Sequence, residues 1–461
     1  MTPMPMTTYD IVILGGGSGG YACALRAAQL GLRVALVEKD KLGGTCLHRG
    51  CIPTKALLHS AEVADSARGS ATYGVRSTFE GIDLEAVHRY KDGVVGRLHK
   101  GLQGLVRAAE GITYVEGEGV LDGPGTVRVG DQELAGDHVV LATGSFARTL
   151  PGIEIGGRIM TSDQAQNLSE VPDRAIVLGG GVIGVEFASV LRSFGAEVTV
   201  VEALDRLVPG EEPTISSHLQ RAFRKRGITS RTGVSVSGVT QDEAGVQVEL
   251  DGGEQLSAEL LLVAVGRGPR SEGLGYAEAG VTLDRGFVQV DERLRTGVGT
   301  VRAVGDLVAG VQLAHRGFAH GIFVAEDIAG LDPEPVRDHL VPKVTYCEPE
   351  IASVGLTEAK AREQHGEATA YEYNLGGNGK SQILGTAGLV RLVRAGTDGP
   401  VVGVHMIGSR MGEQVGEAQL IVGWEALPEE VAAFVHAHPT QNEALGEAHL
   451  ALAGKPLHAH S

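Results

Sequence analysis

One four-part pattern occurs twice in this chain of 461 residues, and it constrains the fold more than any other feature. Each copy reads as a short apolar run, a G-x-G-x-x-G turn, a helical stretch and a second apolar run that ends in Glu. The first copy spans residues 10–38, and each key residue of the second copy lies 164 positions later. A single glycine motif is a weak indication, but two copies in this context predict two parallel-sheet dinucleotide-binding domains.

The glycines and the final acid have separate chemical roles in each copy. Glycine permits a tight turn and lets a pyrophosphate approach the backbone at a helix N-terminus. The acid is expected to accept hydrogen bonds from a ribose. Two copies imply two dinucleotides, one resident and one exchanging. The expected binding residues are Gly15, Gly17, Gly20 and Glu38 in the first copy, and Gly179, Gly181, Val182, Ile183, Gly184 and Glu202 in the second.

The rest of the chain predicts further helices and strands around these two domains. Residues 62–109 should be helical, with a break near 68–74 that is rich in glycine and serine. The expected strands are a hairpin at 112–120 and 126–129, then 138–145, 234–239, 245–250, 260–267 and 301–306. Beyond residue 342, an antiparallel sheet is expected from alternating segments at 344–346, 389–393 and 401–407, with helices at 413–426 and 428–435. The fold class is therefore α/β, with two Rossmann-like domains followed by an α+β domain.

Two cysteines, Cys46 and Cys51, lie five positions apart with Gly50 between them. Gly50 lets the backbone bend enough to bring the sulfurs within bonding range. Pro53 suits the first turn of a helix, which would place Cys51 at a helix N-terminus, where the dipole and Lys55 favour a thiolate. A bridge across so short a loop stabilises a fold by only about 2 kcal/mol, which suits a redox-active pair. From the spacing alone, a structural thiol pair or half of a zinc site remains open.

The residues around this pair, Gly-Gly-Thr-Cys-x4-Cys-Ile-Pro-x-Lys at 43–55, resemble the active-site signature of the class I pyridine-nucleotide disulfide oxidoreductases. These flavoproteins pass electrons between a nicotinamide and a disulfide. The resemblance covers essentially the whole chain. It implies a redox-active Cys46–Cys51 disulfide, non-covalent FAD in the first dinucleotide-binding domain and NAD in the second. His48 and Arg49 depart from the residues that many members carry there, and they place a titratable ring and a cation close to the thiols.

The resemblance also assigns further site residues and the domains. Asp306 ends an apolar strand, and its carboxylate is expected to bind the ribityl hydroxyls of the flavin. The other implied flavin residues are Gly44, Thr45, Lys55, Gly119, Thr143, Gly144, Ser145, Gln312, Leu313, Ala314 and His315. The NAD site gains Glu186, Val234 and Gly266, and Glu186 is expected to pair with Lys55 beside the flavin. The implied domains are residues 1–148 and 273–341 for FAD, 149–272 for NAD and 342–461 for dimerisation.

A segment near the C-terminus, His-Ala-His-Pro-Thr-Gln-Asn-Glu at 436–443, supplies the expected base. A carboxylate beside an imidazole orients the ring and favours its protonated form. The segment resembles the family's base motif, and residue-by-residue matching selects His438 as the base and Glu443 as its partner, with His436 as the alternative. Sites of this family take the histidine from the partner subunit, so the resemblance implies a homodimer. Three other histidines are expected to face solvent: His449, His458 and His460.

Composition and charge exclude several classes of function. The formal net charge of −17 argues against a nucleic acid or an anionic membrane as a partner. No apolar run approaches transmembrane length, and residues 1–9 are too short and too polar for a signal peptide. Four cysteines in a chain of this length fit a reducing compartment, so a cytoplasmic protein is expected. No metal site is expected.

Charge and cysteine content also narrow the substrate. Glu202 would repel a 2′-phosphate by roughly 4 kcal/mol at about 4 Å, which favours NAD over NADP, although Arg206 softens this argument. The chain lacks the extra C-terminal cysteine pair of the mercuric-ion-reducing members and has the paired thiols that the transhydrogenase members lack. We therefore expect oxidation of dihydrolipoamide to lipoamide with reduction of NAD+. The expected partners are lipoyl groups of 2-oxo acid dehydrogenase complexes or of the glycine cleavage system. An NADH-dependent reductase of another disulfide or of a metal ion is the alternative.

Overall fold

The computed structural model describes residues 7–458 of the chain. The chain folds into two compact units, each assembled from three separate segments. Unit 1 comprises Met1–Ala56, Glu85–Arg148 and Arg267–Asp338. Unit 2 comprises Leu57–Leu84, Thr149–Gly266 and His339–Ser461. Each unit therefore contains one copy of the repeated pattern, while the four domain boundaries given above stay a prediction.

Unit 1 is built around a mainly parallel sheet that contains the first copy. Four of its strands pair in parallel in the order β3-β2-β1-β6, and β19 pairs in parallel with β6. These strands are β1 (Thr7–Leu14), β2 (Val34–Glu38), β3 (Ile112–Glu116), β6 (Gln132–Leu141) and β19 (Val301–Ala303). The apolar residues of β1 and β2 are buried along their length, as expected for a parallel sheet that is covered on both faces.

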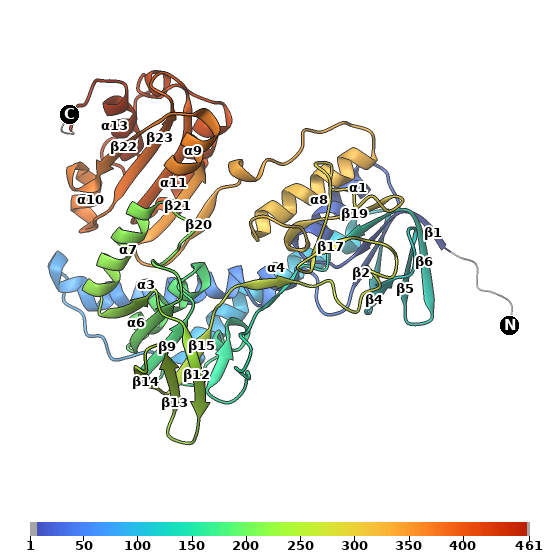
Figure 1. The fold of residues 1–461 in the computed structure, drawn as a ribbon, viewed down its shortest axis with the longest axis horizontal. Coiled ribbons are helices and arrows are strands. Elements are labelled where there is room, and N and C mark those ends of the chain that lie inside the picture. The colour runs from blue at the N-terminus through green and yellow to red at the C-terminus, as the bar shows by residue number, and fades with distance from the viewer. Residues whose placement is uncertain (1–6, 459–461) are drawn as a thin grey trace. The chain divides into compact units, whose positions relative to one another are not determined.

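Two helices of unit 1 pack tightly against each other because glycine lies at their contact. These are α1 (Ser18–Gln29), which follows the first glycine turn, and α8 (Ala314–Ile328); they lie side by side in Figure 1. A Cβ atom on Gly321 of α8 would lie only 2.3 Å from the backbone oxygen of Gly19 in α1. The backbones can approach this closely only where no side chain intervenes.

The hairpin predicted at residues 112–120 and 126–129 was wrong in its first half. Gly117, with φ 152°, ends the run, and its N–H donates to Glu38 O at 2.9 Å. Residues before Gly117 form β3, which joins the parallel sheet beside β2. Only β4 (Gly119–Leu121) pairs antiparallel with β5 (Thr126–Val129). The glycine therefore separates two strands that have different partners.

The helical region predicted at residues 62–109 is interrupted where expected. α3 (Cys51–Gly69) ends in a short 3-10 turn, η1 (Ser70–Tyr73), and α4 (Leu84–Ala108) begins after a stretch with no regular structure. No helix of the described residues is long and apolar enough to cross a membrane.

Unit 2 contains the second copy in a five-stranded parallel sheet, ordered β11-β10-β9-β15-β8. Its strands are β8 (Ile159–Thr161), β9 (Arg174–Leu178), β10 (Glu197–Glu202), β11 (Ile228–Thr232) and β15 (Leu260–Val263). Helix α6 (Val182–Phe194) joins β9 to β10, and α7 (Pro213–Lys225) leads into β11. An antiparallel sheet of β12 (Val236–Gln241), β13 (Val246–Leu250) and β14 (Gln255–Ala258) lies between β11 and β15 in sequence.

The C-terminal part of unit 2 forms the predicted antiparallel sheet, in the order β20-β21-β24-β23-β22. The strands are β20 (Lys343–Thr345), β21 (Glu350–Gly355), β22 (Ala368–Asn374), β23 (Leu389–Ala395) and β24 (Val401–Gly408). The helices after them are α11 (Met411–Gly423), α12 (Pro428–Val431) and α13 (Glu443–Leu452). α12 is shorter than predicted, and the sequence pattern did not predict β21, β22 or α13.

The unpredicted helix α13 explains a wrong prediction for one histidine. His449 was expected to face solvent, but it is fully buried, because α13 packs its apolar residues Ala444, Leu445 and Ala448 into the core. Burial lowers the pKa of His449 to about 4, so the ring is neutral at pH 7. His458 is exposed as expected, and His460 lies outside the described residues.

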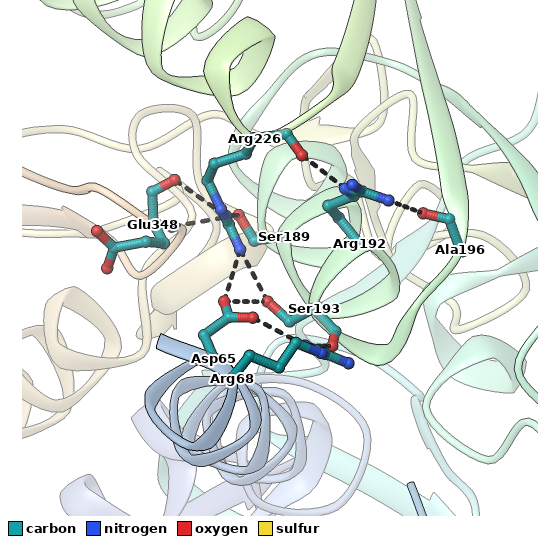
Figure 2. A network of polar contacts seen from close by, with 8 residues as sticks. All are labelled: Asp65, Arg68, Ser189, Arg192, Ser193, Ala196, Arg226 and Glu348. Carbon is teal, nitrogen blue, oxygen red and sulfur yellow. Dashed lines mark hydrogen bonds and ion pairs between the residues drawn. The ribbon is translucent and has the colours of Figure 1, made fainter. Parts of the chain in front are cut away.

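A polar network fixes the second half of α3 to the second-copy domain within unit 2 (Figure 2). The Arg226 guanidinium donates to Asp65 Oδ2 of α3 at 3.0 Å and to Ser193 Oγ of α6 at 2.7 Å. It also donates to the backbone oxygen of Glu348 at 3.1 Å. Burial raises the pKa of the Glu348 carboxyl to about 7. One arginine therefore joins α3, α6 and the loop before β21.

The glycine contact between α1 and α8 predicts a specific sensitivity. We expect Gly321→Ala to lower the midpoint of thermal unfolding, because overpacking costs about 1–3 kcal/mol. Gly101→Ala in α4 is the matched control, since a Cβ atom there would meet no atom within 4 Å. The control should gain up to about 1 kcal/mol from helix propensity. Equal unfolding midpoints for the two variants would contradict the packing argument.

Candidate active site

The two cysteines of the 43–55 segment are brought together by two short helix ends. Cys46 lies in α2 (Gly44–His48), and Cys51 is the first residue of α3. A Cβ atom on Gly50 would lie 3.0 Å from the backbone oxygen of Thr45, so the bend between the helices suits glycine. Both cysteines are free thiols in this structure. The arrangement is that of a reduced thiol pair at a helix N-terminus.

The hydrogen bond between the two thiols and their burial change the pKa of Cys46. The side-chain hydrogen bond with Cys51, together with burial, raises the pKa of the Cys46 thiol well above its ordinary value, and Lys55 opposes this rise only weakly. Because the two thiols share this hydrogen bond, loss of a proton from one depends on the charge of the other. Within residues 7–458, no group of three or more His, Cys, Asp or Glu side chains could hold a metal ion. A zinc site therefore has no ligand set in that part of the chain.

His48 and Arg49 have partners other than the two sulfurs. His48 Nε2 lies 2.8 Å from the backbone oxygen of Leu42, and the ring meets His99 edge-on with centroids 4.7 Å apart. Arg49 forms an ion pair with Asp40 at 2.5 Å, and both side chains are half-exposed. His48 and Arg49 are close to the thiols in sequence, but the polar contacts described here are with other residues.

The first glycine turn has the construction of an anion-binding site. Gly15 has φ +110°, and a Cβ atom on Gly20 would lie 1.8 Å from the Gly15 oxygen. Gly17 precedes α1 without a side-chain cap, which leaves helix N–H groups available to an anion. The Glu38 carboxylate accepts hydrogen bonds from the N–H groups of Gly16 at 2.7 Å and Asp40 at 2.8 Å. The turn itself therefore orients the acid that the sequence assigned to a ribose.

The second glycine turn repeats this construction down to its hydrogen bonds. A Cβ atom on Gly184 would lie 1.9 Å from the oxygen of Gly179, which has φ +107°. Glu202 accepts from the N–H groups of Gly180 at 2.6 Å and Leu204 at 2.8 Å. Gly181 precedes α6 without a side-chain cap. The 164-residue offset read from the sequence thus relates equivalent backbone contacts.

Arg206 makes its hydrogen bonds within its own loop. One guanidinium nitrogen of Arg206 contacts the Asp205 carboxylate at 3.1 Å, and another donates to the Pro209 oxygen at 3.1 Å. The preference for NAD over NADP stays a prediction.

Two of the predicted flavin residues of unit 1, Ser145 and Gln312, form hydrogen bonds with Asp306. Ser145 Oγ donates to Asp306 Oδ2 at 2.6 Å, and Gln312 Nε2 lies 3.4 Å from the Asp306 backbone oxygen. Arg267, which sequence reasoning did not assign to the site, donates to Ser145 Oγ at 2.8 Å and to its backbone oxygen at 3.0 Å. Thr143 Oγ1 donates to the oxygen of Arg270 at 2.6 Å. The Thr143–Ser145 turn is therefore held from several sides.

Several other predicted residues have clear structural positions. A Cβ atom on Gly44 would lie 2.8 Å from Gly17 Cα, so the start of α2 lies against the first glycine turn. Gly119 begins β4, where a Cβ atom would lie 2.5 Å from the Leu14 side chain at the end of β1. Leu313 precedes α8, which begins at Ala314 and includes His315, while Thr45 lies in α2.

The predicted NAD residues outside the turn lie in unit 2. Glu186 is buried in α6, where its Oε1 accepts from Tyr346 N at 2.9 Å. Val234 N donates to Glu202 O at 3.3 Å, and Gly266 has φ +106°. Lys55 belongs to unit 1 and Glu186 to unit 2, so their pairing stays a prediction.

The two histidines of the 436–443 segment differ in exposure. His438 Nδ1 lies 2.7 Å from Glu443 Oε1, and its side chain is 75% exposed. Thr440 N donates to the other Glu443 oxygen at 2.8 Å, which fixes the carboxylate at the start of α13. The His436 side chain is only 11% exposed, and its Nε2 lies 3.0 Å from Glu417 Oε1. Of the two rings, His438 is the one that a substrate could reach.

Comparison with known families defines the class of protein. Residues 9–321 match the pyridine nucleotide-disulphide oxidoreductase family, and residues 341–449 match the dimerisation domain of that family. The chain belongs to this family, and the resemblance and fold class predicted from the sequence are confirmed.

Individual proteins of this family show which members the chain is similar to. The chain is 42% identical over 472 residues to the dihydrolipoyl dehydrogenase of Bacillus subtilis (strain 168), covering 98% of this chain and 99% of that protein. Among solved structures it resembles LpdA from Mycobacterium tuberculosis, with 26% identity, a TM-score of 0.89 and coverage of 97% and 100%. It also resembles the HOCl-induced flavoprotein disulfide reductase RclA from Escherichia coli, solved as a Cu(II) complex, with 27% identity, a TM-score of 0.86 and coverage of 96% and 99%.

The burial of the cysteines predicts how the native thiols react. Cys23 and Cys347 are buried, whereas Cys46 and Cys51 are partly exposed. We expect the reduced native protein to show two thiols per chain that react with DTNB, and the oxidised native protein to show none. Unfolding of the reduced protein should reveal all four. Peptide mapping after alkylation checks the identities, and labelling of Cys23 in the native state would contradict the prediction.

Proposed function

We propose that this protein is a dihydrolipoyl dehydrogenase, which oxidises dihydrolipoamide to lipoamide and reduces NAD+ to NADH. The hydrogen-bonded thiol pair at the N-terminus of α3 carries the proposal. Full-length similarity at 42% identity to a protein of that name supports the choice within the family.

The residues of unit 1 fit FAD as the resident cofactor. The first glycine turn leaves no space for a side chain at Gly20 and offers uncapped N–H groups to a pyrophosphate. Glu38 is oriented for a ribose, and Asp306 with Ser145 presents oxygen atoms for ribityl hydroxyls. When bound, FAD would accept the electron pair of the reduced thiols and deliver it to NAD+. The second glycine turn and Glu202 of unit 2 would hold NAD+.

The chain's own residues account for the chemistry of the dithiol. His438 would remove a proton from one thiol of dihydrolipoamide. The resulting thiolate attacks Cys46 of the oxidised pair, which breaks the Cys46–Cys51 bond and leaves Cys51 as a thiolate. The second substrate thiol then attacks the substrate sulfur of the mixed disulfide and breaks its bond to Cys46. Lipoamide leaves, the proton of the second thiol passes to the released Cys46 sulfur, and His438 keeps the first proton. The raised pKa of Cys46 favours the thiol form of that residue at the end of the reaction.

We also propose a homodimer in which His438 serves the thiols of the partner copy. The matched dimerisation domain exposes the large apolar side chains of Trp424, Phe434 and Val435, and the last two lie within four residues of His438 in the sequence. Exposed apolar side chains of this size favour a protein partner. The proposed substrates in the cell are lipoyl groups of 2-oxo acid dehydrogenase complexes or of the glycine cleavage system. The unpaired buried Cys23 and Cys347 are compatible with a reducing compartment such as the cytoplasm.

The alternative function is an NADH-dependent reductase of another disulfide or of a metal ion. Similarity to a flavoprotein disulfide reductase solved with Cu(II) supports it at 27% identity. The higher identity to a dihydrolipoyl dehydrogenase favours the first proposal.

Two substitutions test the roles of the thiol pair and the base. We expect Cys46→Ser and His438→Gln to lower kcat for dihydrolipoamide and NAD+ by about 10²–10⁴-fold, because each removes a group that handles the dithiol. Reduction of ferricyanide by NADH should persist in both variants, since it needs neither thiol exchange nor the base.

The chain offers a matched control in His458→Gln. His458 is also exposed, and its Nδ1 lies 2.8 Å from Glu447 Oε1. It should keep wild-type turnover. Near-normal dihydrolipoamide turnover in Cys46→Ser or His438→Gln would refute the assigned roles. A wild-type protein that reduces ferricyanide or Cu(II) with NADH but does not oxidise dihydrolipoamide would favour the alternative function.

A third substitution tests the choice of nicotinamide cofactor. We expect Glu202→Gln to raise KM for NAD+ about tenfold, because a hydrogen bond to a charged acceptor contributes about 1.5–3 kcal/mol. The ratio of kcat/KM for NADP+ to that for NAD+ should rise, since the repulsion of a 2′-phosphate is removed. Glu197→Gln, at the exposed opposite end of β10, should change neither value. An unchanged cofactor ratio in Glu202→Gln would contradict the assignment.

A further inference from the structure

One carboxylate is bonded to both ends of the segment that presents His438. Glu417 lies on α11, where its Oε1 is 3.0 Å from His436 Nε2 and its Oε2 accepts from Asn442 Nδ2 at 2.5 Å. His436 precedes His438 by two residues, and Asn442 directly precedes Glu443. The three residues Glu417, His436 and Asn442, here named the clamp, therefore bracket the His438–Glu443 pair.

Within the clamp, the His436 side chain is largely covered, at 11% exposed, whereas the Glu417 side chain is 35% exposed. The His436 ring packs so closely on α13 that a Cβ atom on Gly446 would lie 2.5 Å from its Nδ1. From another side, Gln441 Nε2 donates to Ser409 O at 2.9 Å, and Asn378 Nδ2 donates to Thr440 O at 3.0 Å. The backbone of the segment is thus fixed by polar contacts, while the His438 side chain stays open to solvent.

The charges around His436 favour an ion pair with Glu417. The hydrogen bond with Glu417 raises the pKa of His436 against the effect of burial, and Glu443 on α13 adds to the rise. The same hydrogen bond lowers the pKa of Glu417. His449, also on α13, is neutral at pH 7. The stabilisation by this pair is complete between pH about 4.5 and pH about 6.5, the ordinary pKa values of the two groups. It is lost as pH rises through the raised pKa of His436, and also as pH falls through the lowered pKa of Glu417.

We propose that Glu417 is a positioning residue, which fixes the orientation of the catalytic base through His436 and Asn442. The inference rests on the proposed function, in which His438 takes the proton of the dithiol. A general base must lie within hydrogen-bond distance of that proton, and a displacement of about 1 Å can cost 10²-fold in rate. Glu417 would therefore affect the rate of the dithiol reaction without contacting the dithiol.

The test compares two substitutions on the same helix. Glu417→Gln keeps the shape of the side chain and removes its charge, and Glu413→Gln, one turn earlier and exposed, is the matched control. For Glu417→Gln we expect at least about a tenfold lower kcat with dihydrolipoamide and NAD+, an unchanged KM for NAD+ and unchanged reduction of ferricyanide by NADH. Glu413→Gln should match the wild type.

Substitutions of His436 separate positioning from general stability. His436→Gln keeps an N–H donor near the place of Nε2 and should retain most of the dihydrolipoamide turnover, whereas His436→Leu should lose it to the extent that Glu417→Gln does. Backbone hydrogen–deuterium exchange of residues 434–443, read by mass spectrometry, should become faster in Glu417→Gln and His436→Leu and stay unchanged in Glu413→Gln.

Each outcome decides the proposal. It is overturned if Glu417→Gln matches Glu413→Gln in turnover and exchange, or if Glu417→Gln loses ferricyanide reduction together with dihydrolipoamide turnover. If the wild type reduces ferricyanide but not dihydrolipoamide, the proposed function fails instead. In that case, the hydrogen–deuterium exchange rates still test whether the clamp fixes the backbone of residues 434–443. Faster exchange confined to Glu417→Gln and His436→Leu supports this role of the clamp, and equal rates in all variants overturn it.

Discussion

The structure depends on a steric constraint inside each glycine turn. At Gly20 and at Gly184, a Cβ atom would lie within 2 Å of a backbone oxygen of the same turn. With no side chain there, the strand can pass directly into a helix whose first N–H groups are uncapped. The tight turn also places a backbone N–H where Glu38 or Glu202 can accept its hydrogen bond. One constraint therefore orients both the anion site and the acid beside it.

In unit 1, the same constraint extends to the redox pair. The first turn can accept α2 against it only because Gly44 has no side chain, since a Cβ atom there would lie 2.8 Å from Gly17 Cα. Cys46 follows Gly44 by two residues, and the bend at Gly50 then starts α3 at Cys51. The thiol pair is thus tied to the dinucleotide turn by contacts between backbones, which vary less than contacts between flexible side chains. A site that must present sulfur atoms to a bound ring at a fixed distance benefits from such rigid support.

The sequence predicted those parts whose geometry is set within a few residues. The two glycine turns could be read from spacing, whereas the cysteine segment and the His438–Glu443 pair were selected by their resemblance to the family's motifs. Prediction from the sequence was wrong or absent where the structure of a segment depends on residues far away in the chain. β3 pairs in parallel with β2 and does not form the expected hairpin. His449 is buried because α13 packs against a sheet whose strands precede it in the sequence. Arg267 reaches Ser145 across more than a hundred residues, which no local pattern signals.

The three histidine–carboxylate pairs of the C-terminal region have the same chemical groups but differ in how exposed the histidine is. The His436–Glu417 pair joins a largely covered ring to a carboxylate that is 35% exposed, so solvent screens its attraction only in part and it can serve as an anchor. The exposed His438–Glu443 pair gains little stability from its charges, yet the contact at Nδ1 orients a ring whose side chain is 75% exposed. His458–Glu447 is an exposed pair as well, but it lies at the end of the chain outside the segment that Glu417 holds. The proposed base His438 therefore combines an exposed ring with a segment that is bonded to Glu417 near both of its ends.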